Sequence, residues 1–340
     1  MTPLPLTKPC ELEDFADSDL IEIMRDVCVH KHEVFGHDYP KGFEYRKDWE
    51  VAMAIRAFRR EGSLRPDAKI LGVGAGYEDT LFWLTRHCDQ VFATDRYADA
   101  QEWQGEAPLT MLVEPSILAP YSFDEARLVC QHMDGRLLRY PSDTFDGVFS
   151  SGSIEHFGSV RDIAFAAYEM GRVVKPGGIV SISTELRFAG PPGGTGFEGV
   201  RLFSRTELQR YIVEASGLEL IGRLTDDISP ATAESERRDL ATVVRERNER
   251  VKTQPFDRLW MHLEFPHLLL SHEGYVFGSV HLALRKGDGY PYCDNSWAKP
   301  TSTLAETIRS ENAVSVEKSR AIGRPRASRV GRLLARLRPS

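Results

Sequence analysis

The chain has 340 residues, of which 41% are hydrophobic and 27% charged, a composition typical of one large globular domain or two ordinary ones. Its formal net charge of −7 argues against a general nucleic-acid binder, and no apolar run approaches the roughly 20 residues that span a bilayer. The acidic N-terminus has no secretory signal and the five cysteines form no CxxC pair, so we expect a cytoplasmic protein with reduced thiols.

The first 62 residues are expected to be helical. Apolar residues recur at three- and four-residue steps from Glu11 to about Arg60, and glycines and a proline between residues 36 and 42 break the stretch into two pieces. We interpret residues 1–62 as a helical lid. Tyr45, in a stretch rich in histidine, tyrosine and charge, is a candidate acceptor-binding residue of this lid.

Strands and helices alternate in the next part of the chain. Short apolar strands are predicted at 69–73, 90–95, 127–134, 145–153 and 178–185, with helices at 79–87 and 161–174. Strands separated by helices in this way predict parallel βαβ units, with helices on both faces of one sheet.

After Glu185 the pattern changes. A glycine- and proline-rich stretch over 187–200 predicts a mobile loop. The following stretch SRTELQRYIVEASG predicts a helix with Ser204 as its N-cap and Glu207 completing a capping box.

The last third of the chain predicts closing strands at 218–222 and 275–286, with a charged helix from about Ala231 to Arg250 between them. Between Lys318 and Arg338 lie eight basic and no acidic residues, with leucines at helical spacing. This tail is expected to be either a solvated, largely disordered segment or a helix that docks on a membrane surface or partner. The predicted divisions are the lid (1–62), a cofactor-binding core (63–222), an acceptor-site insertion (223–275), a closing strand (276–286) and the tail (287–340).

The glycine turn in KILGVGAGYEDT is the main candidate for a cofactor site. Gly72, Gly74 and Gly76 allow a ligand to approach the backbone closely. The dinucleotide fingerprint GxGxxG fails, because the sixth position is Tyr77 or Asp79 where a small residue is required. A phosphate-binding loop is excluded because the Gly-Lys-Ser/Thr sequence is missing.

Two acidic residues follow the next two predicted strands. Asp95 ends the second strand, where its carboxylate can accept hydrogen bonds from ribose hydroxyls. Asp134 follows the third strand, where it can accept from an adenine amino group. Since the carboxyl ends of parallel strands meet at one edge of a sheet, we expect the glycine turn and both carboxylates to converge on one ligand.

Motifs in this order resemble those of the class I S-adenosylmethionine-dependent methyltransferases. They are LGVGAG, ATDRY, HMDGRLLRYPSDTFDGVFSSGSIEHF and MGRVVKPGGIVSIS, with a weaker echo in LFSRTELQRYIVEASGLELIG. The resemblance covers about Asp67 to Glu185. It implies a doubly wound, Rossmann-like α/β fold with a mostly parallel seven-stranded sheet, and S-adenosylmethionine as the cofactor. The cofactor-binding residues that it implies are Gly72, Gly74 and Gly76 for the methionine part, Asp95 for the ribose and Asp134 with Gly135 for the adenine, together with Arg96 and Ser151.

Methyl transfer to a hydroxyl requires a base as well as alignment, because the hydroxyl must lose its proton. Histidine is the side chain that most readily takes a proton at neutral pH. His156 in SGSIEHFG follows the fourth predicted strand and is our candidate base, with Glu155 beside it to orient it or to bind the acceptor. The alternative is that this Glu-His pair only shapes the cofactor pocket.

A second group of histidines lies in WMHLEFPHLLLSHEG. His262 is a further candidate base, and the candidate acceptor-binding residues here are Trp260, Glu264, His267 and His272. Three histidines and a carboxylate can hold Mg²⁺ or Zn²⁺, but their spacing matches no closed metal site, so no metal ligand is assigned. A requirement for Mg²⁺ stays open.

The acceptor is predicted to be a saccharide. A polar insertion rich in histidine and aromatic residues favours a small or oligomeric polar acceptor over a nucleic acid. Phe256, Trp260 and Tyr275 offer aromatic faces for sugar rings, and the whole chain resembles methyltransferases of bacterial polysaccharide and glycolipid clusters. A mannoside or glucoside hydroxyl is therefore expected. A natural-product, lipid or protein acceptor stays open as an alternative, as does a non-catalytic S-adenosylmethionine-binding scaffold.

Overall fold

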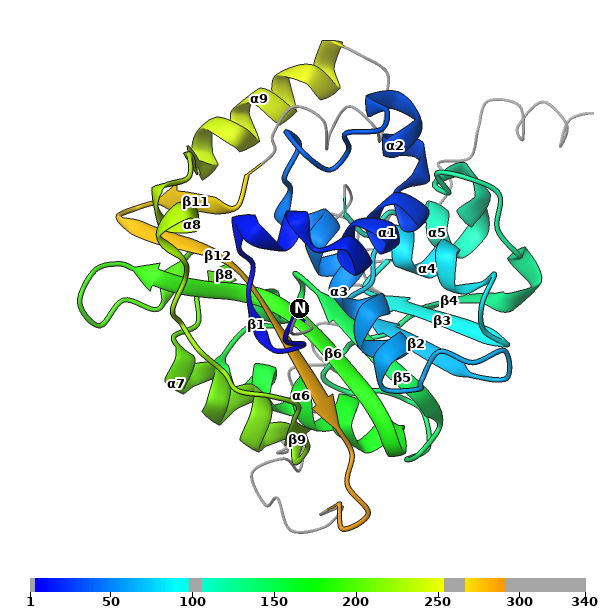
Figure 1. The fold of residues 1–340 in the computed structure, drawn as a ribbon. Helices are drawn as coiled ribbons and strands as arrows, with labels where there is room; N and C mark the ends of the chain where they lie inside the picture. Colours follow the sequence, from blue (N-terminus) through cyan, green and yellow to red (C-terminus); the bar gives the residue numbers. More distant parts are fainter. Residues whose placement is uncertain (1–3, 98–105, 254–266, 291–340) are drawn as a thin grey trace, which may run out of the picture. The chain divides into compact units, whose positions relative to one another are not determined.

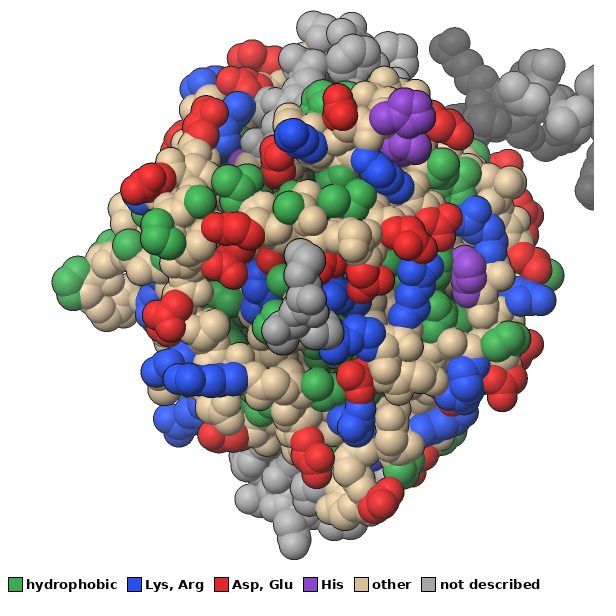
Figure 2. Space-filling model, viewed as in Figure 1, with side chains coloured by type: hydrophobic (Ala, Val, Ile, Leu, Met, Phe, Trp, Pro, Cys, Tyr) green, Lys and Arg blue, Asp and Glu red, His purple; other side chains and the backbone are tan. Residues whose placement is uncertain are grey.

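The structure, a computed structural model, describes residues 4–97, 106–253 and 267–290 (Figure 1). All of them belong to one compact unit, Met1–Asp294, so the predicted basic tail lies almost entirely outside the described residues. Within the described ranges, no helix is both long enough and apolar enough to cross a membrane. On the face of the molecule that Figure 2 shows, acidic and basic side chains are interspersed.

The predicted apolar strands form the parallel half of the main sheet. In spatial order they are β4 (Leu128–His132), β3 (Gln90–Asp95), β2 (Lys69–Val73), β5 (Phe145–Ser151) and β6 (Val174–Ala189). Each neighbouring pair in this order is parallel. Their carboxyl ends therefore share one edge of the sheet, as the sequence predicts.

An antiparallel strand, β12 (Tyr275–Arg285), runs along β6 and carries several short strands on its other side. Three of them pair directly with β12, and the fourth pairs with β11: they are β1 (Lys8–Pro9), β9 (Glu219–Leu220), β11 (Leu269–His272) and β10 (Arg237–Asp239). The described part of the sheet thus has ten strands where seven were predicted. Short extended segments of the N-terminal part and of the insertion pair along edges that would otherwise leave backbone groups unpaired.

Helices precede the first parallel strand and lie between the later strands along the chain. They are η1 (Leu12–Ala16), α1 (Ser18–Val27), α2 (Val29–Phe35), α3 (Arg46–Arg60), α4 (Asp79–Leu84), α5 (Thr110–Val113), η2 (Pro115–Ile117), η3 (Glu125–Arg127), η4 (Ile154–His156), α6 (Val160–Val173), α7 (Arg205–Leu208), η5 (Gln209–Glu214), α8 (Pro230–Glu234) and α9 (Leu240–Thr253). The predicted capping box of α7 is confirmed: the Ser204 side chain accepts from the Glu207 backbone N–H, and the Glu207 carboxylate accepts from the Ser204 N–H.

Side-chain alternation along the strands divides the core into two layers. Ile70 and Phe149 belong to one hydrophobic cluster with residues of α1, α3 and α4. Leu71 and Val148, their sequence neighbours, belong to another cluster with residues of α6 and α7. Because successive residues of a strand point to opposite faces, the two clusters cover the two faces of the sheet, and the doubly wound α/β fold is confirmed.

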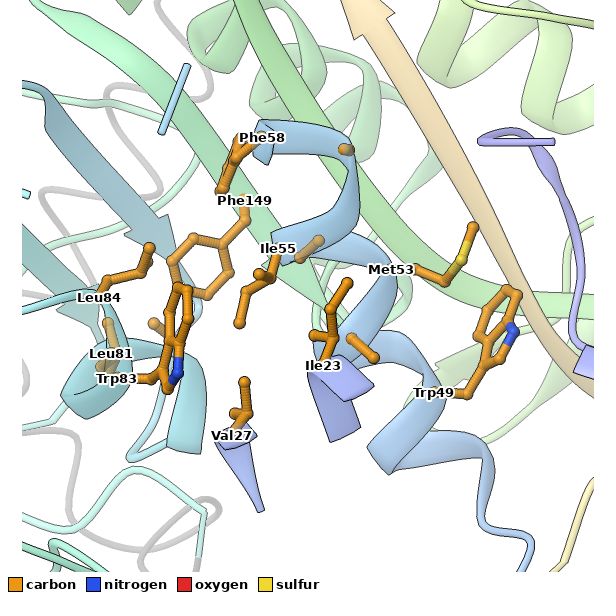
Figure 3. Packing of buried hydrophobic residues seen from close by; sticks show 14 of the residues in the cluster. Ile23, Val27, Trp49, Met53, Ile55, Phe58, Leu81, Trp83, Leu84 and Phe149 are labelled. Carbon is orange, nitrogen blue, oxygen red and sulfur yellow. The ribbon is translucent and has the colours of Figure 1, made fainter. Parts of the chain in front are cut away.

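Helix α3 is part of the core, although its segment was predicted as a lid. It contacts β5, β6 and β12, and Figure 3 shows its residues Ile55 and Phe58 close to Phe149 of β5. Both α3 side chains are fully buried. The first residues of α3, Arg46 and Lys47, lie near the carboxyl ends of β5 and β6, and this helix thereby brings charge to the expected site.

The charged helix predicted from Ala231 to Arg250 is two helices with a strand between them. Helix α8 ends at Glu234, and Ser235 takes an extended conformation with ψ of 157°. Strand β10 then pairs with residues 269–271 of β11. The extended segment pairs its backbone with β11 at the edge of the sheet. The pattern of charged residues along the sequence does not indicate such pairing.

The glycine- and proline-rich stretch predicted as a mobile loop contains regular structure. Strand β6 continues to Ala189, and β7 (Gly196–Phe197) and β8 (Val200–Arg201) form an antiparallel hairpin. Gly194 lies so close to Tyr275 that a Cβ atom there would be 2.2 Å from the tyrosine hydroxyl. These glycines permit turns and close packing as well as motion, which is why composition alone did not predict the hairpin.

Candidate active site

The glycine turn between β2 and α4 is held in a conformation that requires glycine. Gly74 and Gly76 have positive φ angles of 63° and 48°. A Cβ atom at Gly74 would lie 2.7 Å from Cβ of Ser153, and one at Gly76 would lie 2.4 Å from the Glu106 carbonyl oxygen. Gly72 lies inside β2, where a Cβ atom would be 2.8 Å from the ring of Phe149, so its small size serves packing beneath the turn.

Asp95, at the end of β3, is tied directly to this turn. Its Oδ2 accepts from the Gly76 N–H at 2.8 Å, and its Oδ1 accepts from the Arg96 N–H at 2.6 Å. Burial raises the pKa of Asp95, and these two backbone hydrogen bonds oppose that shift. A carboxylate has about four acceptor positions, so Asp95 retains capacity for ribose hydroxyls.

Asp134, after β4, is engaged by an arginine that the sequence analysis did not assign to the site. The guanidinium of Arg136 donates to both carboxylate oxygens at 2.6–3.1 Å, and the Arg136 backbone N–H donates at 2.9 Å. Although burial acts to raise it, Arg136 holds the pKa of Asp134 below its usual range. The signal was present in the HMDGR motif, since residues two apart across a turn can pair.

The connection from β5 to α6 closes over the glycine turn. Ser153 donates its hydroxyl hydrogen to the Gly74 carbonyl at 2.5 Å. The Phe157 ring lies 3.2 Å from a Cβ position at Gly74 and 2.7 Å from one at Gly135. Ser151, the buried last residue of β5, begins this connection, so the predicted cofactor residues from four strand ends do converge on one edge.

His156, in η4 of the same connection, has a defined tautomer. Its Nδ1 lies 2.8 Å from the carbonyl oxygen of Gly199 in the β7–β8 hairpin. Because a carbonyl only accepts, Nδ1 carries the proton, and the neutral ring has its lone pair on Nε2. This is the form in which a histidine can take a proton from a hydroxyl.

Glu155 and His156, which are adjacent in the motif, make side-chain hydrogen bonds to different residues. It is buried and accepts from the Thr184 hydroxyl at 2.8 Å. Burial raises the pKa of Glu155. Gly199 is thus a hydrogen-bonding partner that orients His156, while the nearby charge of His156 acts to lower the pKa of Glu155.

Glu155 and four charged residues near it form what we call the α3 charge cluster, namely Arg46, Lys47, Glu50, Glu155 and Glu185. Arg46 Nη1 lies 2.6 Å from Glu185 Oε1, and Lys47 Nζ lies 3.0 Å from Glu50 Oε2. Although burial acts to raise it, Arg46 and Lys47 hold the pKa of Glu185 below its usual range. Lys47 is the most accessible of the α3 members, with 31% of its side chain exposed. Its Nζ lies 2.2 Å from a Cβ position at Gly152, just after β5.

Two of the predicted acceptor-binding residues lie beside this cluster. The half-buried Tyr45 ring is 5.3 Å from the ring of His267, and His267 Nε2 lies 3.3 Å from Arg46 Nε. His267 is buried. His272 instead packs its ring edge-on against Phe197 of the hairpin, 4.7 Å away.

Five further residues were predicted for the base or the acceptor site, namely Phe256, Trp260, His262, Glu264 and Tyr275. Phe256, Trp260, His262 and Glu264 lie outside the described residues. Tyr275 is 5% exposed under the glycine-rich hairpin, so the prediction that its face stacks on a sugar ring is wrong. Among the described residues, no group of three or more His, Cys, Asp or Glu side chains is placed to hold a metal ion.

Residues 71–182, from β2 to β6, match the family model of a methyltransferase domain. The match covers this part of the chain and not its N- or C-terminal segments. The matched stretch contains the glycine turn, both carboxylates and η4. No protein of curated function matches the sequence.

Solved structures similar to this one include proteins of different activities. The [4+2]-cyclase SpnF is 18% identical, with 84% of this chain and 98% of that chain covered and a TM-score of 0.46. A putative sarcosine dimethylglycine methyltransferase from Galdieria sulphuraria is 15% identical, with 77% and 99% covered and a TM-score of 0.46. The geranyl diphosphate C-methyltransferase from Streptomyces coelicolor A3(2) is 13% identical, with 84% and 92% covered and a TM-score of 0.42. Likeness at this level does not identify an acceptor.

The residues at the carboxyl edge fit S-adenosylmethionine. Gly74 and Gly76 keep the turn narrow, because an added Cβ atom would meet Ser153 or the Glu106 carbonyl oxygen. Asp95 retains acceptor positions for a diol, and Asp134 and Gly135 lie at the next strand end. The Asp95 carboxylate therefore has the chemistry that the ribose of the cofactor requires.

Proposed function

We propose that this chain transfers a methyl group from S-adenosylmethionine to a hydroxyl group of a small polar acceptor, first of all a saccharide, with His156 as the base. The observation that carries the proposal is the tautomer of His156. Its Nδ1–H donates to Gly199, so Nε2 is the ring nitrogen that can accept a proton, and His156 belongs to the connection that closes over the glycine turn. The sugar hydroxyl follows from the sequence and from the polar groups near this edge.

The cofactor is held by the residues that the motifs single out. Backbone atoms of Gly74 and Gly76 approach its methionine part, the Asp95 carboxylate accepts from the ribose hydroxyls, and Asp134 with Gly135 meets the adenine. When bound, the cofactor supplies a methyl group on a positively charged sulfur, open to in-line displacement. This chain's own task is to align the acceptor and to manage its proton.

His156 manages that proton. When the methyl carbon exchanges its bond to the donor sulfur for a bond to the acceptor oxygen, the thioether would leave as S-adenosylhomocysteine and the O–H proton would pass to Nε2 of His156. The Gly199 carbonyl keeps the His156 ring oriented throughout. The same carbonyl stabilises the protonated ring, because it continues to accept the hydrogen bond from Nδ1–H. General base catalysis of this kind typically contributes a factor of about 10²–10⁴ in rate.

The α3 charge cluster supports a polar acceptor. Lys47, partly exposed, offers a donor next to Gly152, and Tyr45 and His267 lie close by. Charged and hydrogen-bonding groups suit a hydroxyl-rich molecule, whose own donors and acceptors must be matched on leaving water.

The test is titration calorimetry followed by turnover. S-adenosylhomocysteine should bind the purified chain, and mannosides and glucosides are then screened for its formation from S-adenosylmethionine. His156→Gln should lower turnover by about 100-fold or more with unchanged affinity for S-adenosylhomocysteine. The matched control is His87→Gln, since His87 stacks on Trp83 beyond α4, away from the carboxyl edge.

Each outcome has a defined meaning. Full activity of the His156→Gln variant would refute the role of His156 as base. Turnover with a lipid or natural product but no sugar would replace the acceptor class. Cofactor binding without turnover on any acceptor would favour a non-catalytic scaffold.

A further inference from the structure

Two arginines near His156 share a single carboxylate. Arg187 comes from the end of β6 and Arg201 from β8. Arg201 Nη2 donates to Glu207 Oε1 at 2.5 Å, and Arg187 Nη2 lies 3.7 Å from Glu207 Oε2. Two positive charges therefore face one negative charge.

The shared carboxylate is already fully engaged. Glu207 accepts from both the backbone N–H and the hydroxyl of Ser204 at 2.8 Å, in the capping box of α7. Burial acts to raise the pKa of Glu207, but the hydrogen bonds from Ser204 and Arg201 lower it. Glu207 is thus an anion that serves the helix first and cannot satisfy both guanidinium groups.

Each arginine retains a buried donor with no acceptor. Nη1 of Arg187 and Nε of Arg201 have no hydrogen-bond partner among the described residues. The side chains are 21% and 18% exposed, so other atoms of these groups remain accessible. A buried N–H without a partner is costly, and a planar guanidinium presents its donors in a fork that matches an oxyanion.

The position of the pair relates it to the acceptor rather than to a remote surface. Strand β8 contacts η4, which carries His156, and Gly199, two residues before Arg201, is the residue that holds the His156 ring. Arg187 lies near the carboxyl end of β6, next to Glu185 at the same edge of the sheet. An anion bound between the arginines would therefore lie on the acceptor side of the base.

We propose that Arg187 and Arg201 form an oxyanion site that binds a phosphate or carboxylate group carried by the acceptor. The anion supplies the missing negative charge and accepts from the two unpartnered N–H groups. The site itself is independent of methyl transfer, whereas its role as an acceptor anchor rests on the proposed function. The acceptor class becomes an anionic polar molecule, such as a sugar phosphate or a sugar acid.

The experiment titrates the full chain with inorganic phosphate at constant ionic strength, followed by glucose 6-phosphate, glucuronate and glucose. Saturable phosphate binding is expected, with glucose 6-phosphate or glucuronate competing for it and glucose not competing. Arg187→Gln and Arg201→Gln should each weaken binding by about tenfold or more, because each removes charge-assisted hydrogen bonds. Arg205→Gln is the matched control: Arg205 begins α7, its side chain is 50% exposed, and it pairs with Asp226.

Failure takes distinct forms. The proposal is overturned if phosphate does not saturate the chain, if the two variants bind as the parent does, or if Arg205→Gln weakens binding equally. Phosphate binding without competition from glucose 6-phosphate or glucuronate would overturn the acceptor role and leave a free-anion site. If a glutamine variant does not fold, Arg187→Lys and Arg201→Lys keep the charge but lose the planar fork, and should still weaken binding.

A parallel titration with S-adenosylhomocysteine separates this proposal from the proposed function. Phosphate affinity lost in the arginine variants with normal cofactor affinity supports the oxyanion site. If the parent chain binds phosphate but does not bind S-adenosylhomocysteine, the proposed methyltransferase function is overturned and the anion site is retained.

Discussion

Asp95 joins two parts of the site at the level of single atoms. Its two oxygens accept from backbone N–H groups on either side, those of Gly76 and Arg96. The residue therefore fixes the glycine turn before any ligand arrives. The proposed binding of the ribose by Asp95 would couple cofactor affinity to the stability of the turn.

Asp95→Ala should weaken S-adenosylhomocysteine binding by about tenfold to a hundredfold and lower the free energy of unfolding by about 1–3 kcal/mol, since two buried donors lose their acceptor. Asp95→Asn keeps one acceptor oxygen and should fall between the parent and Asp95→Ala in both measurements. Calorimetry gives the affinity and urea unfolding the stability. Unchanged affinity in Asp95→Ala would remove Asp95 from the cofactor site.

Gly76→Ala should destabilise the turn by more than its backbone strain alone. The positive φ costs an alanine about 1–2 kcal/mol, and the Cβ atom would also meet the Glu106 carbonyl oxygen at 2.4 Å. Gly193→Ala is the control, because Gly193 has a φ of 70° with no atom within 4 Å of the added Cβ. Urea unfolding should show the larger loss for Gly76→Ala; equal losses would mean that the contact is relieved at no cost.

Local signals made part of the site predictable from sequence. The Ser204–Glu207 capping box and the position of Asp95 depend on residues a few places apart or on a strand that directly precedes them. The Arg46–Glu185 ion pair could not be predicted in the same way, because 139 positions separate its partners and only the packing of α3 on the sheet brings them together. The cofactor and base assignments stay predictions.

At the level of elements, the packing of α3 on the sheet makes this part of the N-terminal segment belong to the core. Its apolar face packs on the sheet, and its first turn supplies charge to the site. A lid that opens as a unit is incompatible with a helix whose central residues are fully buried. The helical periodicity predicted α3 correctly but could not tell a covering helix from a core helix.

Phe58→Ala tests this position of α3. Phe58 is fully buried against Gly147 and Ile70, so its truncation should cost about 3–5 kcal/mol of unfolding free energy. Val34→Ala on α2, where the side chain is 55% exposed, should change stability by less than about 0.5 kcal/mol. If Phe58→Ala lowered the unfolding free energy as little as Val34→Ala does, the side chain of Phe58 in α3 would be dispensable for the core.

His281 makes the pairing of β1 with β12 sensitive to pH. Its Nδ1 donates to the Leu6 carbonyl and its Nε2 accepts from Ser181. Burial lowers the pKa of His281 to about 4, from 6.5 for an unperturbed histidine. The unfolded chain therefore binds the proton more readily, and stability falls as the pH drops from about 6.5 to about 4, with no effect above that range.

The loss attributable to His281 should approach 3 kcal/mol, since each unit of pKa difference corresponds to about 1.4 kcal/mol. Urea unfolding at pH 7 and pH 4 measures it, and His281→Gln should reduce the difference between the two pH values. His37→Gln, at an exposed histidine, is the control. An identical pH dependence in His281→Gln would contradict the assignment.

At the scale of the whole chain, the regular alternation of apolar strands and helices made the doubly wound sheet predictable. The strands β1, β10 and β11 were not predicted, because each has four residues or fewer and depends on β12 or on its neighbour β11 for pairing. Residues with little intrinsic preference become strands only where an edge is available. The number of strands is therefore a property of the assembled sheet.

Removal of the residues after Asp294 should leave the core intact. All described residues belong to the unit that ends there, and Tyr290, which donates to the Ser216 carbonyl at 2.8 Å, is retained. The shortened chain should keep its thermal midpoint within about 2 °C and its affinity for S-adenosylhomocysteine, because every contact between described residues is retained. Differential scanning calorimetry checks this, and a clear drop in the midpoint would show that the basic tail supports the fold.

The pairing of β1 with β12 also sets a schedule for folding during synthesis on the ribosome. Lys8 pairs with His281, so the first strand must wait for a partner that is translated 273 residues later. At 5–20 residues per second, that delay lasts roughly 15–55 s. The side of α3 that packs on β12 has no cover from that strand during this time, and its exposed apolar surface makes the nascent chain prone to aggregation until β12 emerges.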